Sequence, residues 1–207
     1  ALKLFEKDTA LAGLSFAIEN YSKSSAIETV DFMLEHYYWL PCQRRRTFAN
    51  FLSLYSSFYK KKEFITADYE ELDTYGEDII VNFNLSEKGY KLLFEPSNKV
   101  THINIKKNFY SFINHQLKIG IGAAVVRKKI HIPYQSIFVK FPLLILITPL
   151  YVVPRMGLTY LVRDDFKNFS FFLRHLYLFF IGNFFWALGF LKEATVKNEI
   201  LRNNTCS

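Results

Sequence analysis

Two adjacent carboxylates, Glu77 and Asp78, stand where a polar stretch passes into a helical pattern. Apolar residues recur over positions 79–85 with the spacing of one helix face, and Gly89 follows as a helix stop. A carboxylate within hydrogen-bond reach of a hydroxyl can act as a general base. The helix dipole favours negative charge at this end, which predicts that Asp78 is ionised near neutral pH. The structural alternative is that Asp78 caps the helix.

The elements upstream of this pair begin with a strand and a helix. Residues 10–18 form a short apolar run that is typical of a buried strand. Residues 27–39 have the spacing of an amphipathic helix, which Pro41 stops. The apolar and aromatic residues 48–59 fit a strand followed by a helix, and the charged residues 60–63 close that segment.

Downstream of Gly89 the pattern becomes extended and then helical. Residues 90–94 predict a short strand that Glu95 and Pro96 break, and residues 99–103 predict another extended piece. Residues 109–126 predict a helix. This succession of helix, glycine, strand, proline and strand indicates an α/β arrangement.

Two apolar segments follow, at about 137–153 and 171–191. A helix that spans a bilayer needs about 20 apolar residues, so both segments are candidates. Basic residues at 127–129 precede the first segment and Lys192 follows the second, which favours a hairpin with both ends on the cytoplasmic side. The alternative is a pair of buried or interfacial helices.

Composition narrows the class of protein. Half of the residues are hydrophobic and 18% are aromatic, so the chain can bury a core and is not disordered. Cys42 and Cys206 lie far apart and offer neither a disulfide framework nor a Cys-x-x-Cys metal site. The net charge of +7 accompanies a long apolar region, which favours a membrane surface and phosphorylated substrates over nucleic acid.

Several motifs occur in a fixed order over residues 8–130. Gly-Glu-Asp at 76–78 is followed by a helix, by Gly-Tyr at 89–90, by Pro96 and by Val-Thr-His at 100–102. Gln-Leu-Lys-Ile-Gly then follows at 116–120, and Tyr-Glu-Glu precedes the set at 69–71. In order and spacing these motifs resemble the C-terminal half of family 2 glycosyltransferases with the GT-A fold.

The resemblance implies a function and a set of roles. The chain would be part of an inverting glycosyltransferase that moves a sugar from a nucleotide-sugar to a saccharide or lipid-linked acceptor, in cell-surface polysaccharide synthesis. Asp78 would be the general base, and Glu77 would orient it or contact the acceptor. His102 would reach a divalent metal (Mg or Mn) or the diphosphate, although it can also be an ordinary polar residue at a strand end.

Substrate contacts are implied for three further residues. Gln116 and Lys118 would contact donor diphosphate or acceptor, or else form a solvated helix face. Tyr55 stands where the family often has Asn, in an acceptor-binding segment. The basic run at 44–46 either faces phosphates or is a solvated loop.

The sequence departs from the family in one major respect. The nucleotide-binding half and its Asp-x-Asp metal motif are absent from these residues, and the chain begins at Ala1, so we expect a fragment that is inactive alone. The expected organisation is a partial GT-A catalytic domain over 1–130, two membrane-associated helices over 131–195 and a polar tail over 196–207. The expected location is the cell membrane, with the catalytic part on the cytoplasmic side. The competing hypothesis is a non-catalytic, membrane-anchored scaffold or degenerate transferase.

Overall fold

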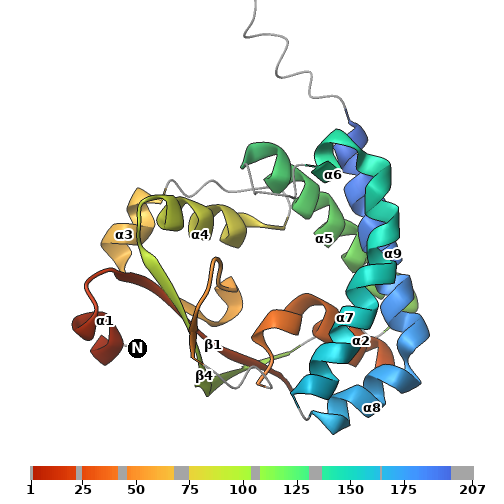
Figure 1. Cartoon of the computed structure of the whole chain (residues 1–207), viewed down its shortest axis with the longest axis horizontal. Coiled ribbons are helices and arrows are strands. Elements are labelled where there is room, and N and C mark those ends of the chain that lie inside the picture. The colour runs from red at the N-terminus through yellow and green to blue at the C-terminus, as the bar shows by residue number, and fades with distance from the viewer. Residues whose placement is uncertain are drawn as a thin grey trace, which may run out of the picture.

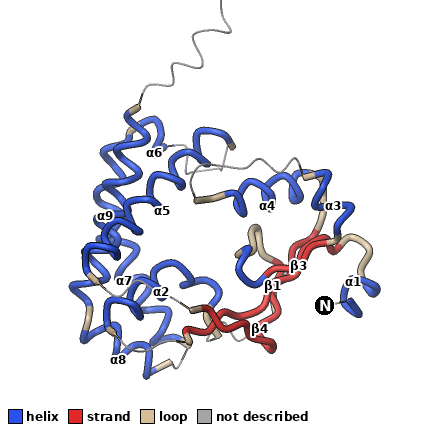
Figure 2. The backbone as a smooth tube through the Cα atoms, turned by 180° about the vertical axis from the view of Figure 1, so that it is seen from behind, coloured by secondary structure: helices blue, strands red, loops and turns tan. Residues whose placement is uncertain are grey.

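The architecture is mixed α/β, with helices on the faces of a sheet and a layer of apolar helices at one side (Figures 1 and 2). The structure, a computed structural model, describes residues 2–21, 25–41, 46–67, 75–103, 108–130, 137–163 and 165–196. The segments Tyr-Glu-Glu at 69–71 and Arg-Arg at 44–45, both cysteines and the tail from residue 197 lie outside the described residues.

The sheet of the described residues has four strands in the order β2-β4-β1-β3. The long strand β1 (Leu11–Asn20) pairs in parallel with β4 (Lys91–His102). Short antiparallel strands flank this pair, β2 (Thr47–Phe48) beside β4 and β3 (Ser57–Tyr59) beside β1. The predicted strand at 10–18 is therefore confirmed. Because β1 and β4 run in parallel, their carboxyl ends meet, and Asn20 pairs with His102.

Strand β4 differs from its prediction. The sequence indicated two extended pieces separated at Glu95 and Pro96, whereas the structure has one strand with an irregular register. Phe16 of β1 pairs with Glu95, and the next residue, Ala17, pairs with Lys99. Three residues of β4 therefore have no partner on β1, as in a β-bulge that accommodates a proline lacking its N–H.

Helices α3 (Lys61–Thr66) and α4 (Glu77–Glu87) lie above the sheet in the view of Figure 1, and α1 (Leu2–Lys7) lies near the N-terminus. The predicted helix from 78 is confirmed, and Gly89 has a positive φ of 80° as a helix stop should. For residues 48–59 we expected a strand followed by a helix, and this was wrong. A 3-10 turn (Leu54–Ser56) comes first and the strand β3 follows it. Lysines 60–62 lead into α3 instead of closing an element.

Helices α2 (Ala26–His36) and α5 (Phe109–Lys129) confirm two further predictions. A 3-10 turn (Tyr37–Trp39) extends α2. The Ser25 hydroxyl accepts the N–H of Glu28, and the Asn108 side chain accepts the N–H of Ser111. These are N-caps, which satisfy backbone donors that have no partner within the helix.

The apolar region folds into α6 (Ile137–Lys140), a 3-10 segment (Pro142–Ile147), α7 (Thr148–Val162), α8 (Phe166–Arg174) and α9 (Leu176–Thr195). Within the described residues, two stretches are long and apolar enough to cross a membrane, Pro142–Val162 and Leu176–Thr195. Helices α7 and α9 pack side by side. A third of each stretch is buried in the protein. The first stretch exposes several large apolar side chains, whereas α9 exposes Tyr177 and Phe184 and is otherwise mostly buried or half-buried.

Helix α9 packs along α5 with the two backbones close together. A side chain at Gly120 of α5 would meet the backbone at Trp186, and one at Gly189 of α9 would meet the backbone at Leu117. Small residues permit such a close approach of two helices. One hydrophobic cluster also joins the parts on either side of residue 130, because it contains Val81 of α4 and Tyr160 of α7.

Candidate functional site

Gly76 sets the entry to α4 and thereby the position of Glu77 and Asp78. Its φ of +118° lies in the left-handed region, where a side chain is strained. An added Cβ would also strike the side chain of Val126 on α5. Glu77 and Asp78 therefore occupy the first turn of α4, and an Asp78 oxygen accepts the N–H of Ile79 at 2.9 Å.

The environment of Asp78 is buried enough to change its protonation. Burial raises the pKa of Asp78 to about 6, helped by the negative charge of Glu77 and opposed by the hydrogen bond from the Ile79 N–H. The helix dipole favoured a low pKa, but the loss of water outweighs it. At pH 7 the ionised form still exceeds the protonated form by about tenfold. A base with a pKa near the working pH is well suited to proton abstraction.

Asn82, one turn along α4, connects Asp78 to the sheet. Its side-chain N–H donates to the backbone oxygens of Asp78 at 2.6 Å and Leu52 at 2.8 Å. Its oxygen accepts the hydroxyl of Tyr59 in β3 at 3.0 Å. Burial raises the pKa of Tyr59 to about 12, so that hydroxyl remains a donor at neutral pH. The start of α4 is thus fixed against the neighbouring loop and strand.

Tyr55, in the 3-10 turn before β3, lies between Asp78 and the end of the sheet. Its pKa is raised strongly by burial of the hydroxyl, and next by the charge of Glu35, with a smaller effect from Asp78. Its ring contacts those of His36 and His102, with centroids 5.3 and 4.9 Å away. The parallel pairing of β1 and β4 brings His102 to this position.

Two neighbouring side chains of α5 share a buried partner on α2. His115 Nδ1 lies 2.9 and 3.0 Å from the carboxylate oxygens of Asp31, and Gln116 donates to Asp31 at 2.8 Å. Asp31 is fully buried. The Nε2 atom of His115 lies 3.8 Å from Glu35. These contacts hold α2 and α5 together through polar groups in the interior.

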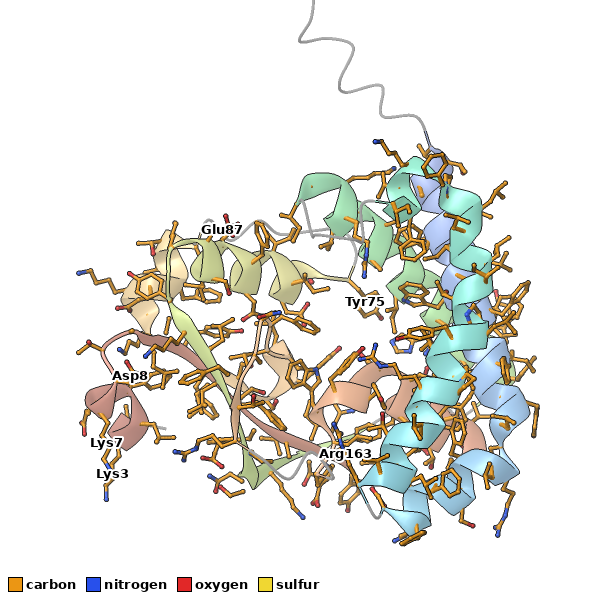
Figure 3. All side chains as sticks on the ribbon, viewed as in Figure 1. Lys3, Lys7, Asp8, Tyr75, Glu87 and Arg163 are labelled. Atoms are coloured by element: carbon orange, nitrogen blue, oxygen red, sulfur yellow. The ribbon has the colours of Figure 1, made fainter. Side chains whose placement is uncertain are left out.

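Tyr75 completes this group of residues between α4 and α5 (Figure 3). Its ring lies 5.5 Å from that of His115, and its backbone passes so close to Gly122 that a side chain there would not fit. Burial, then the charges of Glu35 and Asp31, raises the pKa of the Tyr75 hydroxyl. We name the following residues the polar cluster: Asp31, Glu35, His36, Tyr55, Tyr75, His102, His115 and Gln116.

The polar cluster contains three of the residues that the sequence singled out, Tyr55, His102 and Gln116, and Asp78 borders it through Tyr55. Lys118 does not join them, because it is exposed on α5. Arg46, the described member of the basic run, donates to Glu95 at 2.5 Å. The acidic residues of α2 were not predicted from the sequence as part of a site. A signal was present, because Asp31 interrupts an apolar helix face.

A divalent metal remains an expectation from the resemblance. Within the described residues, no group of three or more His, Cys, Asp or Glu side chains is arranged to hold a metal ion. His102 is surrounded by the rings of Phe32, His36 and Tyr55. These neighbours do not make a metal site, so the described residues by themselves do not fit the group.

Two cavities lie outside the polar cluster, and none of the cluster residues lines them. One of about 570 Å³ lies among the ends of β1, α2 and α8, and one of about 530 Å³ is lined by Ile79 of α4 and by aromatic residues.

Comparison with known proteins adds no relative, since no protein-family model, curated protein or solved structure matches the chain. The described residues thus form a mixed α/β structure in which two helices are apolar and long enough to cross a membrane.

Proposed function

We propose that this chain carries the acceptor side of an inverting, family 2-like glycosyltransferase with Asp78 as general base. The observation that carries the proposal is the state of Asp78. It is a largely buried carboxylate whose pKa is raised to about 6, at the start of a helix and beside the polar cluster. A carboxylate that only caps a helix is solvated, so burial does not raise its pKa.

In the proposed reaction an acceptor hydroxyl donates its proton to the Asp78 carboxylate. The hydroxyl oxygen forms a bond to the anomeric carbon of a nucleotide-sugar, and the bond from that carbon to the diphosphate oxygen breaks. The diphosphate leaves with the electron pair. Glu77 raises the pKa of Asp78 by its charge, which favours proton uptake. The half-exposed Tyr55 is assigned the contact with the acceptor. Gln116 is buried against Asp31 and would act only by positioning that carboxylate.

The donor would be bound by a nucleotide-binding half, since no Asp-x-Asp motif occurs in these residues. We assign His102 a contact with the leaving diphosphate as part of the proposal. The acceptor is a saccharide or a lipid-linked saccharide of cell-surface polysaccharide synthesis.

Membrane association would be interfacial. Helix α9 packs along α5, and α5 carries the buried polar pair His115 and Gln116. If α9 crossed a bilayer, the α/β part packed along it would enter the hydrocarbon as well, at a large cost for its polar groups. The exposed apolar residues of α7 to α9 support a helix layer that lies in the membrane surface.

The general-base assignment is tested by Asp78→Asn in the full-length protein, with transfer measured over a panel of nucleotide-sugars and cell-envelope acceptors. We expect a loss of transfer of about 10²- to 10⁴-fold. The matched control is Glu87→Gln, at the exposed far end of the same helix (Figure 3), which should keep full activity. Wild-type activity should also rise with pH through about 6 as Asp78 ionises. Retention of most activity in Asp78→Asn refutes the assignment.

The competing function is a membrane-anchored scaffold or degenerate transferase. It predicts no transfer by the wild-type protein with any donor of the panel, and equal assembly of partner proteins by wild type and Asp78→Asn. The buried carboxylate favours the enzyme, because a scaffold has no use for an ionised group held away from water.

The interfacial geometry has its own test. Ser170 of α8 is exposed, and a spanning hairpin would put α8 on the opposite side of the membrane from α1. In a variant lacking Cys42 and Cys206, Ser170→Cys and Lys3→Cys should be labelled by an impermeant maleimide from the same side. Labelling of the two positions from opposite sides would establish a spanning hairpin instead.

A further inference from the structure

The cavity of about 570 Å³ has a basic wall on α8. Lys167, Arg174 and His175 line it, and their spacing puts them on one face of α8 and its end. Among the described lining residues the one acid is Glu19, whose carboxylate is paired with Lys99 at 2.5 Å. The cavity is therefore positively charged on balance and suited to an anion.

Asn20, at the carboxyl end of β1, supplies an independent observation. It lines the same cavity, and both polar atoms of its side chain are buried without a hydrogen-bond partner among the described residues. Buried amides nearly always have partners, so this one points to a ligand with acceptor oxygens and hydroxyls. The first turn of α2, with Ser25 at its N-cap, borders the cavity and adds the positive end of a helix dipole.

Exposed apolar side chains lie beside the basic wall. Three apolar side chains are each more than half exposed: Phe166 and Leu173 of α8 and Tyr177 of α9. Each of them lies one or two positions along the chain from a residue that lines the cavity. A ligand that filled the cavity with an anionic head could lay a hydrocarbon chain over these residues. Such a ligand is an amphiphile with a phosphate or diphosphate group.

The cavity also adjoins the candidate site. Asn20 is the register partner of His102, and Phe32 lines the cavity while its ring lies 6.1 Å from that of His102. A head group bound at Asn20 is thus next to His102 of the polar cluster.

We propose that this cavity binds the diphosphate head of a lipid-linked acceptor, with Lys167, Arg174 and Asn20 as ligand-binding residues and the prenyl chain on the exposed face of α8. The proposal rests on the proposed function for the identity of the ligand as an acceptor. The binding site itself depends only on the cavity, its charge and the amide of Asn20.

The experiment is direct binding to the full chain in neutral detergent, by isothermal titration. The probes are farnesyl diphosphate, inorganic pyrophosphate, farnesol and a short-chain phosphatidylglycerol. We expect farnesyl diphosphate to bind at least tenfold more tightly than the other three. Lys167→Ala and Arg174→Ala should each weaken its binding about tenfold, and Asn20→Ala severalfold. Lys192→Ala, an exposed lysine of α9 outside the cavity, should leave binding unchanged.

Each other outcome overturns a stated part of the proposal. Equal binding of pyrophosphate shows a site for free diphosphate, and equal binding of phosphatidylglycerol shows a general headgroup site. Equal binding of farnesol, or no effect of the three cavity substitutions with circular dichroism unchanged, removes the site. Asp78→Asn should bind farnesyl diphosphate as wild type does. Failure of the base assignment is therefore distinguishable from failure of this site.

Discussion

The α/β part and the layer formed by α7, α8 and α9 distribute their polar and apolar residues in opposite ways. The α/β part buries Asp31, His115 and Gln116 in its interior. The helix layer exposes large apolar side chains, including Leu150 and Leu158. A soluble domain normally avoids both arrangements, since buried charge and exposed apolar patches are each costly in water.

One packed structure therefore combines a polar interior with an apolar surface. In the proposed function these features answer two demands: the buried polar groups serve a site that holds charge away from water, and the exposed apolar groups contact a lipid surface. Both demands meet at α5, which carries the polar pair on one side and packs on α9 with the other. Four variants test this contrast between a polar interior and an apolar surface, in order of decreasing expected effect.

The largest effect should come from Asp31→Ala in the polar cluster. It leaves His115 and Gln116 buried without their shared partner, which should lower the free energy of unfolding by about 3–5 kcal/mol. The measurement is urea unfolding in mild detergent, followed by circular dichroism. Glu19→Gln, which removes an exposed ion pair with Lys99, should cost only about 0–1 kcal/mol. Equal costs for the two variants would mean that the cluster is solvated.

The second effect concerns the contact between the two regions. Gly120→Leu should lower the free energy of unfolding by about 2–3 kcal/mol, because the side chain would meet the backbone of α9. Gly89→Ala is the control, since it introduces only backbone strain at a positive φ with open space around it, at about 1 kcal/mol. A harmless Gly120→Leu would show that α9 does not pack on α5 in solution.

The third effect has the opposite sign. The pKa of Asp78 in the folded protein lies above the usual value, so the fold favours the neutral carboxyl, and stability is lost as pH rises through about 6. Asp78→Asn should therefore raise the free energy of unfolding at pH 7 by about 1–3 kcal/mol. The gain should shrink to nothing as the pH falls toward 4. A residue that merely capped α4 would instead lower stability by about 0.5–2 kcal/mol when replaced.

The smallest effect on stability should come from the exposed apolar face. The double variant Leu150→Ser/Leu158→Ser should change unfolding by less than about 0.5 kcal/mol, since both residues are exposed. Its partition into anionic vesicles, measured by sedimentation, should fall about tenfold or more. Leu178→Ser, at a buried position of α9, should destabilise the protein instead. Unchanged vesicle binding of the double variant would assign the face to another partner.

Much of the fold could be predicted because its signals are local. Strand β1 and helices α2, α4 and α5 have apolar periodicity and end signals within their own residues. Strand β3 has three residues and exists because it pairs with β1, so the segment 48–59 carried no reliable signal of its own. The continuity of β4 past Pro96 likewise depends on β1.

The candidate site was predictable only in part. Ordered motifs indicated Asp78, Tyr55, His102 and Gln116, and the structure brings these residues close to one another. The contact between Asp31 and His115 joins residues 84 positions apart, which no local pattern encodes. The sequence predicted that Asp78 is ionised near neutral pH, which agrees with a pKa of about 6, but it did not predict that burial raises this pKa. The helix dipole can be read from sequence, whereas the amount of water excluded from a side chain depends on the tertiary structure.

The pair of glycines between α5 and α9 has a mechanical consequence. Flexible side chains normally separate two helices and absorb small shifts, but at Gly120 and Gly189 one backbone rests directly on the other. Tightly packed interiors transmit displacement instead of damping it. A displacement of α9 is therefore transmitted to α5, the helix that carries His115 and Gln116, with little damping between them.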